Sequence, residues 1–78
     1  MVTISIVGRY ERYEGWLDKA SLEVYRIIEQ MGEIKDIELE TITFQRNIFP
    51  VKLKRTCNCY TRRAVEELRT NSLVKVIQ

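Results

Sequence analysis

The sequence predicts an α+β domain of the ferredoxin-like α/β-plait type, an antiparallel sheet with two helices on one face. A segment that alternates apolar and small polar residues opens the chain, a long stripe of apolar residues has helical spacing, and the expected elements follow the order β-α-β-β-α-β. All of them fit into one small domain, residues 1–78. A chain this short buries only about 60–65% of its unfolded surface, which favours surface binding over a deep catalytic pocket.

The beginning of the chain predicts a strand followed by an exposed loop. Residues 2–6, VTISI, alternate apolar and small polar side chains, which is the period of a half-buried strand. Residues 8–15, GRYERYEG, interrupt this pattern with two glycines. Tyr10 and Tyr13 of this loop are candidate partner contacts, because an aromatic ring on a loop can stack on a base or a side chain. The alternative is that they cover the edge of the core.

A helix is expected next, from Trp16 to Met31. Apolar residues recur there at steps of three and four and form one stripe along about four helical turns. Gly32 follows in the position of a helix C-cap. The charged residues lie off the stripe, so this helix is expected to be structural.

The middle of the chain predicts two strands joined by a turn. Ile37 and Leu39 alternate with Glu38 and Glu40, which predicts a strand with one acidic face. Ile42 and Phe44 continue on the opposite parity, so a β-bulge is expected near Thr41. Residues 45–47, QRN, are the expected turn. In residues 49–59 the apolar residues and cysteines share one parity and the cationic and polar residues the other, which predicts a strand with a cationic outer face. Pro50 lacks an N–H donor and belongs at the start or edge of that strand.

The end of the chain predicts a short helix and a last strand. Thr61 is a suitable N-cap for a helix that runs to Thr70. Asn71 can end this helix, and residues 73–77, LVKVI, form the last strand.

Charge is distributed unevenly along the chain, although the net charge is only +2. Residues 1–43 hold five Lys and Arg against nine Asp and Glu, whereas residues 44–78 hold eight against two. No acid occurs in residues 44–63, and the six cations there are the candidate nucleic-acid or anion-binding residues: Arg46, Lys52, Lys54, Arg55, Arg62 and Arg63. This asymmetry favours a polyanionic or acidic partner. The alternative is that an acidic strand simply pairs with its basic neighbour.

The segment 54–63, KRTCNCYTRR, places two thiols between pairs of cations. A structural zinc site usually needs four Cys or His ligands, and the chain has two cysteines and no histidine. Only two copies of the chain could share such a site, so no metal and no other cofactor are expected. Packing of Cys57 and Cys59 at the core end of a strand is the favoured interpretation, because free cysteine is commonly buried.

Cys57 and Arg63 also have the C-x5-R spacing with which a thiolate and an arginine hold a phosphate or arsenate ester. A strand-to-helix junction at this point would add backbone N–H groups and the helix dipole. The intervening residues 58–62 contain no glycine that would let the backbone curl round an anion, and no general acid lies nearby. We therefore expect the spacing to be fortuitous and the protein not to be an enzyme.

Two segments resemble a known family. Residues 46–51, RNIFPV, and residues 67–76, ELRTNSLVKV, look like the corresponding pieces of a ferredoxin-like small-subunit ribosomal protein that binds rRNA together with a partner protein. The resemblance implies the plait fold and an RNA partner.

The sequence leaves two functional hypotheses. The first is a non-catalytic module that binds nucleic acid, RNA being favoured, through the six cations, with Tyr60 as a further partner contact. The second is a regulatory or inhibitory accessory module that binds an acidic protein surface or forms a homodimer. No apolar run approaches the roughly 20 residues of a membrane span, so a cytoplasmic protein without membrane contact is expected.

Overall fold

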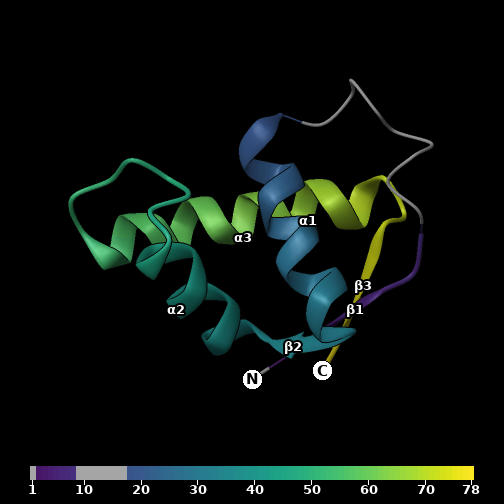
Figure 1. The fold of residues 1–78 in the computed structure, drawn as a ribbon. Coiled ribbons are helices and arrows are strands. Elements are labelled where there is room, and N and C mark those ends of the chain that lie inside the picture. Colours follow the sequence, from purple (N-terminus) through teal and green to yellow (C-terminus); the bar gives the residue numbers. More distant parts are fainter. Residues whose placement is uncertain (1, 9–17) are drawn as a thin grey trace.

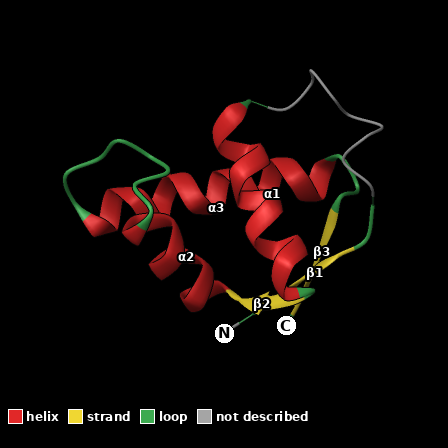
Figure 2. Ribbon diagram, viewed as in Figure 1, coloured by secondary structure: helices red, strands yellow, loops and turns green. Residues whose placement is uncertain are grey.

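The computed structural model describes residues 2–8 and 18–78, which form three strands and three helices (Figure 1, Figure 2). In chain order they are β1 (Thr3–Ile6), α1 (Lys19–Met31), β2 (Glu33–Lys35), α2 (Asp36–Gln45), α3 (Lys54–Thr70) and β3 (Val74–Ile77). The expected α+β class with an antiparallel sheet is confirmed. Tyr10 and Tyr13, the candidate contacts on the expected loop, lie outside the described residues.

The sheet has the strand order β2-β1-β3, and both pairs are antiparallel. Ile4 of β1 is opposite Ile34 of β2 and Val76 of β3, and these residues belong to the core or pack against it. The alternate positions form the other face: Thr3, Ser5, Glu33, Lys35, Lys75 and Ile77. The period-two alternation therefore separates an apolar face from a largely polar one.

The core lies between the apolar face of the sheet and helices α1 and α3. Its members are Ile4, Val24, Tyr25, Ile27, Ile28, Ile34, Leu39, Ala64, Val65, Leu68, Leu73 and Val74. Helices α1 and α3 both pack on the strands and on each other, whereas α2 packs mainly on α3 (Figure 1). The helices thus cover one face of the sheet, as expected.

Helix α1 ends where the sequence predicts and has a clear cap at each end. The Ser21 backbone N–H donates to Asp18 Oδ1 at 2.8 Å, so Asp18 is the N-cap. Gly32 has a φ of 76°, in the left-handed region that glycine adopts without strain, and its N–H donates to the Glu29 carbonyl. The expected C-cap is confirmed. The expected helix start at Trp16 lies outside the described residues.

The end of β1 is held against the turn that precedes β3. The N–H groups of Val7 and Gly8 both donate to the Leu73 carbonyl, at 2.9 and 3.1 Å. A Cβ atom on Gly8 would lie 2.6 Å from the Ser72 carbonyl oxygen, so only glycine allows this approach. The expected strands at both ends of the chain are therefore present and paired with each other.

Residues 37–44 are helical, so the strand expected there is wrong. As part of α2 they bury Leu39 and Thr43, four residues apart, with none of either residue exposed. The cost is that Ile37 stays 54% exposed. The alternation of apolar and acidic residues has the strand period, but packing against α3 decides the conformation. The parity change near Thr41 reflects the helical period and not a bulge.

The expected turn at residues 45–47 is confirmed as the end of α2. The Arg46 N–H donates to the Ile42 carbonyl at 2.9 Å, and Asn47 has a φ of 51°. Asparagine tolerates this left-handed conformation better than most residues. The chain then passes through an irregular segment that contains Pro50 and reaches α3.

Helix α3 begins at Lys54, so the strand expected at residues 49–59 and the N-cap expected at Thr61 are both wrong. The buried residues of α3 are Cys57, Thr61, Ala64, Val65 and Leu68, which form one helical stripe. Thr61, only 1% exposed, is a polar member of this stripe, which is why the stripe looked as if it began after it. The alternating pattern of residues 49–59 runs across a loop and the first turns of α3, so it does not reflect a strand.

The full ferredoxin-like plait is not present in the described residues. Of the four expected strands, residues 37–44 are helical and residues 49–59 form a loop and the start of α3, while a short strand, β2, occurs where none was expected. A plait has four strands, whereas the sheet of residues 2–8 and 18–78 has three. The observed order is β-α-β-α-α-β.

Candidate functional site

Four of the six predicted binding cations lie on the α2–α3 connection and the start of α3. Arg46 follows α2, Lys52 lies in the loop, and Lys54 and Arg55 open α3. Figure 1 shows this end of the molecule projecting away from the sheet. All four side chains are exposed, and none makes an ion pair with another described residue. Their charge is therefore directed to solvent.

The start of α3 lacks the groups that usually stabilise a helix N-terminus. Its N-cap residue, Leu53, supplies no side-chain hydrogen bond, and its first turn contains no acid. The first-turn N–H groups therefore have no capping side chain. Positive charge at this end of a helix opposes the helix dipole by a few tenths of a kcal/mol per residue. A bound anion would offset that cost.

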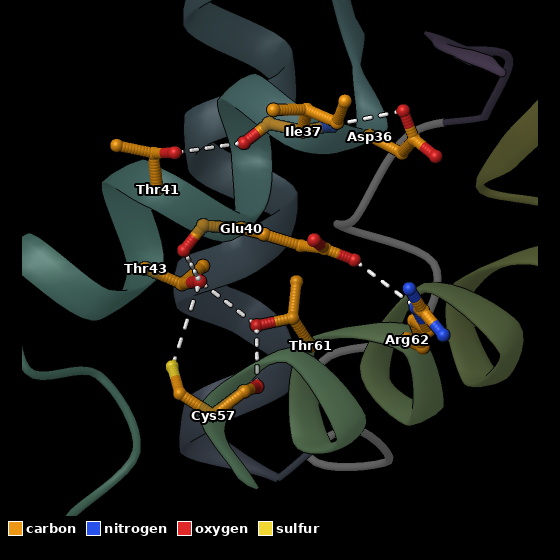
Figure 3. A network of polar contacts seen from close by, with 8 residues as sticks. All are labelled: Asp36, Ile37, Glu40, Thr41, Thr43, Cys57, Thr61 and Arg62. Carbon is orange, nitrogen blue, oxygen red and sulfur yellow. Dashed lines mark hydrogen bonds and ion pairs between the residues drawn. The ribbon is translucent and has the colours of Figure 1, made fainter. Parts of the chain in front are cut away.

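Arg62, the fifth predicted cation, is engaged in an ion pair within the fold. Its Nε donates to Glu40 Oε1 at 3.1 Å, which joins α3 to α2 (Figure 3). The Glu40 side chain is 10% exposed, whereas the Arg62 side chain is 75% exposed. Arg62 thus supplies the counter-charge of a mostly buried carboxylate. Glu40 was expected on the outer, acidic face of a strand and is instead inside the α2–α3 interface.

Two buried hydroxyl groups lie next to this ion pair and connect the same helices (Figure 3). Thr43 Oγ1 and Thr61 Oγ1 are 2.8 Å apart. Thr43 Oγ1 also lies 2.9 Å from the Glu40 carbonyl, and Thr61 Oγ1 lies 2.9 Å from the Cys57 carbonyl. Each hydroxyl has one proton, so when one hydroxyl donates to the other, only one of the two carbonyls receives a hydrogen bond from a threonine hydroxyl. The pair fixes how α2 and α3 are aligned.

The two cysteines have different environments. Cys57 is fully buried, and its Sγ lies 3.9 Å from Thr43 Oγ1, so the packing interpretation is confirmed for this residue. Cys59 is exposed, so the same interpretation is wrong for Cys59. On a helix, residues two apart point about 200° away from each other, whereas a strand would have made them parallel.

The C-x5-R spacing does not form an anion loop here. Residues 57–63 are all helical, and the Cys57 thiol faces α2 inside the protein. Arg63 lies on the exposed side of α3. Thiolate attack on a phosphate needs an accessible sulfur beside the arginine, and this arrangement does not provide it.

Arg63, the sixth predicted cation, belongs to a cluster with two aromatic rings. The rings of Phe49 and Tyr60 stack with centroids 5.7 Å apart and an interplanar angle of 20°. The Arg63 guanidinium carbon lies 5.8 Å from the Tyr60 ring centroid. A cation at this distance from a ring is attracted by the ring's quadrupole. The loop and α3 therefore bring together three groups that recognise flat or anionic ligands.

A hollow of about 410 Å³ lies beside this cluster, between the start of α1 and the middle of α3. Its lining consists of Asp18, Ser21, Phe49, Tyr60, Arg63, Ala64 and Glu67. Ser21 Oγ donates to Glu67 Oε2 at 2.9 Å and thereby connects α1 to α3. The hollow combines aromatic rings, one cation and two carboxylates, and its volume lies in the range of ligand pockets.

A smaller hollow, of about 220 Å³, lies on the other side of α3 near Arg62. It is lined mainly by aliphatic side chains of the strands, α2 and α3, together with the Glu40–Arg62 ion pair, Asp36 and Glu66. Glu66 is also hydrogen-bonded to Arg69, which together with the charge of Arg69 lowers the pKa of the Glu66 carboxyl. This region is dominated by internal ion pairs.

Comparison with known proteins yields no relative: the chain matches no protein-family model, no curated protein and no solved structure. The resemblance of residues 46–51 and 67–76 to a ribosomal protein stays a resemblance of segments. Among the described residues, no helix is long and apolar enough to cross a bilayer, and no three His, Cys, Asp or Glu side chains are grouped as metal ligands would be.

The structure brings together some of the predicted residues and separates others. Arg62 and Arg63 are adjacent in sequence but point about 100° apart on α3, one towards α2 and the other towards the aromatic cluster. Phe49 and Glu67 were not predicted as site residues. The helix predicted after Thr61 already places Glu67 one turn after Arg63, whereas only a helix that begins at Lys54 places Tyr60 one turn before Arg63. A helical assignment of residues 54–60 would therefore have brought Tyr60 into the cluster, but not Phe49, which lies in the loop.

Proposed function

We propose that the protein is a non-catalytic binding module for nucleic acid, RNA being favoured, and that it binds through the cationic end formed by Arg46, Lys52, Lys54, Arg55 and Arg63. The observation that carries the proposal is the gathering of exposed cations, without described carboxylate partners, at one end of the molecule. Arg62, in contrast, is paired with Glu40 within the fold.

Phosphate binding explains why these residues occur where the helix dipole disfavours them. Lysine and arginine near phosphates release condensed counterions, which supplies most of the affinity of non-specific nucleic-acid binding. The uncapped start of α3 adds N–H groups that favour an anion. Arg62 is left out of the proposed interface because its guanidinium compensates the Glu40 charge.

The affinity of the protein for fluorescent RNA and DNA 20-mers, measured by anisotropy at 50 and 200 mM salt, tests this function. Four to five contacts with single-stranded phosphates predict that this fourfold increase in salt weakens binding roughly 50- to 130-fold. Lys54→Ala/Arg55→Ala is expected to weaken binding at 50 mM and to reduce the log–log salt slope by about 1.4.

The matched control is Lys35→Ala/Lys75→Ala, which removes two cations from the polar face of the sheet. It makes the same change in net charge and is expected to have a much smaller effect. If both double variants weaken binding equally, the cationic end is not the interface. If neither nucleic acid binds at 50 mM salt, the function is not nucleic-acid binding.

Capture of an acidic protein surface is the second candidate, and Leu53 is the observation in its favour. This side chain is 59% exposed between two lysines, Lys52 and Lys54. Burial of Leu53 against a partner would give a contact with an apolar centre and a charged rim. Leu53→Ser would weaken such a complex and would leave the salt-dependent binding of nucleic acid nearly unchanged. Measurement of the native mass then shows whether the partner is a second copy.

A further inference from the structure

We propose that the hollow between α1 and α3 takes an unpaired guanine base, either within a nucleic-acid strand or as free guanosine monophosphate. This inference rests on the proposed function, which concerns phosphate contacts alone, and adds a base-selective contact to it. It is argued from the three kinds of groups that line the hollow.

The aromatic wall supplies a surface for a flat ring. Phe49 and Tyr60 are already parallel to within 20°, so a base can stack on this aromatic surface once the Arg63 guanidinium, which lies over the Tyr60 ring, moves outward. Proteins that bind single strands use such aromatic platforms, because every base presents a π-face. Tyr60 is 41% exposed and Phe49 is partly buried, which leaves this wall accessible while Phe49 is held by the core.

The two carboxylates that also line the hollow, those of Asp18 and Glu67, select bases that donate hydrogen bonds. Glu67 uses Oε2 to accept the Ser21 hydroxyl, and Asp18 uses Oδ1 to accept the Ser21 N–H. Within the described residues, the second oxygen of each carboxylate has no partner. These free oxygens accept hydrogen bonds and cannot donate them.

Guanine matches that requirement best. Its Watson–Crick edge offers two adjacent donors, N1–H and the N2 amine, which a carboxylate can accept side by side. Adenine and cytosine each offer one amine next to an acceptor nitrogen, which a carboxylate repels. Uracil offers one N–H between two carbonyls. The hollow therefore discriminates by the number of donors on the base edge.

Arg63 gives the base an adjacent phosphate contact. Its guanidinium faces the Tyr60 ring, and it makes no hydrogen bond or ion pair with another described residue. Contact through the face of the guanidinium leaves its N–H edges free, and these edges match a phosphate. Arg63 thus belongs both to the hollow and to the cationic end.

The test uses fluorescent uridine 11-mers with one central guanosine, inosine or adenosine at 50 mM salt. Guanosine is expected to bind roughly tenfold tighter than adenosine. Inosine keeps N1–H but lacks the N2 amine, so its affinity is expected to lie between the two. The three strands have identical charge, so phosphate contacts cancel from the comparison.

Glu67→Gln is the decisive variant. Its amide oxygen can still accept the Ser21 hydroxyl, whereas its NH₂ group replaces the free acceptor and faces the donors of guanine. The preference for guanosine is expected to fall below about twofold. Glu66→Gln, one residue earlier and outside this hollow, makes the same chemical change and is expected to keep the preference.

The stacking wall is tested separately with Tyr60→Leu. This partly exposed position tolerates the change better than Phe49, which packs against the core. The loss of one stacking ring is expected to weaken binding of the guanosine strand roughly tenfold. Far-UV circular dichroism confirms that the variant is folded.

The outcomes separate this inference from the proposed function. Equal affinity for the three strands, with a steep salt dependence, would overturn the guanine site and leave the nucleic-acid function intact. Binding of no strand would overturn the proposed function. In that case, titration of ¹⁵N-labelled protein with guanosine monophosphate decides whether the hollow binds a free nucleotide; no shift of its amide signals would overturn the inference as well.

If the strands do bind, competition of the fluorescent guanosine strand with guanosine monophosphate distinguishes the two sources of guanine. Displacement of the guanosine strand by guanosine monophosphate at similar concentrations assigns the hollow to free nucleotides. Displacement only at far higher concentrations assigns it to a guanine within a strand.

Discussion

The two sides of α3 differ although neighbouring arginines mark them. On the side towards α2, Arg62 pairs with the mostly buried Glu40, and a pair of threonine hydroxyls closes the interface. On the side towards α1, Arg63 lies over an aromatic stack at the edge of an open hollow. The difference teaches that a run of cations does not define a binding surface, because each charge is available only if the fold leaves it without an internal partner.

The comparison requires that residues 54–60 are helical, and a pair of proline variants tests this with the largest expected effect. Asn58→Pro removes a hydrogen bond inside α3 and is expected to lower the free energy of unfolding by about 3 kcal/mol or more. Lys54→Pro, at the first helical position, follows Leu53 in an extended conformation (φ −112°, ψ 134°) and is expected to change it by less than about 1 kcal/mol.

Urea unfolding followed by circular dichroism measures both proline variants. Equal destabilisation by the two would mean that this segment is not a helix beginning at Lys54, and the separation of Arg62 from Arg63 would then lose its basis.

The second prediction compares the two arginines directly. Arg62→Ala leaves the Glu40 carboxylate without its partner and is expected to destabilise the protein by about 1–2 kcal/mol. Arg63→Ala loses only a contact with an exposed ring and is expected to cost about 0.5 kcal/mol. Denaturant midpoints at constant salt provide the measurement. Arg62→Ala/Glu40→Leu is expected to recover most of the loss, and failure to recover would show that charge compensation is not what Arg62 contributes.

The third prediction concerns the hydroxyl pair that closes the α2 side. Thr43→Val and Thr61→Val each remove one hydroxyl, and the remaining hydroxyl still has its own backbone carbonyl as an acceptor. A double-mutant cycle is therefore expected to give a coupling energy of about 0.5–1.5 kcal/mol. Additive effects would mean that the two hydroxyls do not bond to each other.

The smallest expected effect lies on the exposed side of α3, where Arg69 hydrogen-bonds to Glu66 and lowers its pKa. A folded-state pKa below that of the unfolded chain stabilises the protein above the unfolded value, and this contribution is lost as pH falls through the folded value. An NMR titration of the Glu66 carboxyl is expected to show a lowered midpoint in the wild type and an ordinary one in Arg69→Gln. Equal midpoints in the wild type and in Arg69→Gln would mean that Arg69 does not lower the pKa of Glu66.

Local sequence patterns predicted the outer parts of the chain correctly. The strand at residues 2–6 has a clear period of two, the strand at residues 73–77 is a short apolar run after Asn71, and α1 has a stripe of apolar residues followed by Gly32, whose left-handed φ ends the helix. Each signal depends on a few neighbouring residues. The exposure of Lys52, Lys54 and Arg55 also follows from their chemistry, because long charged side chains are rarely buried without a partner.

The middle of the chain could not be predicted in the same way. The order of apolar and polar residues in 37–44 is typical of a strand. Leu39 and Thr43 are nevertheless buried on one side of a helix, because α3 lies beside α2. Thr61 has the residue type of an N-cap, and its place in the buried stripe of α3 depends on a hydroxyl partner from α2. A polar residue inside a core is recognised as such only when its partner is known.

The sequence by itself determined the α+β class, the strands at both ends, the extent of α1 at its C-terminal end and the concentration of cations in residues 44–63. Tertiary structure alone decided that residues 37–44 are helical, that α3 starts at Lys54, and that Arg62 and Arg63 have different roles. The physical reason is range. Periodicity and capping are encoded within one or two turns of chain, whereas the burial of Thr43, Thr61 and Glu40 depends on partners that only the packed helices supply.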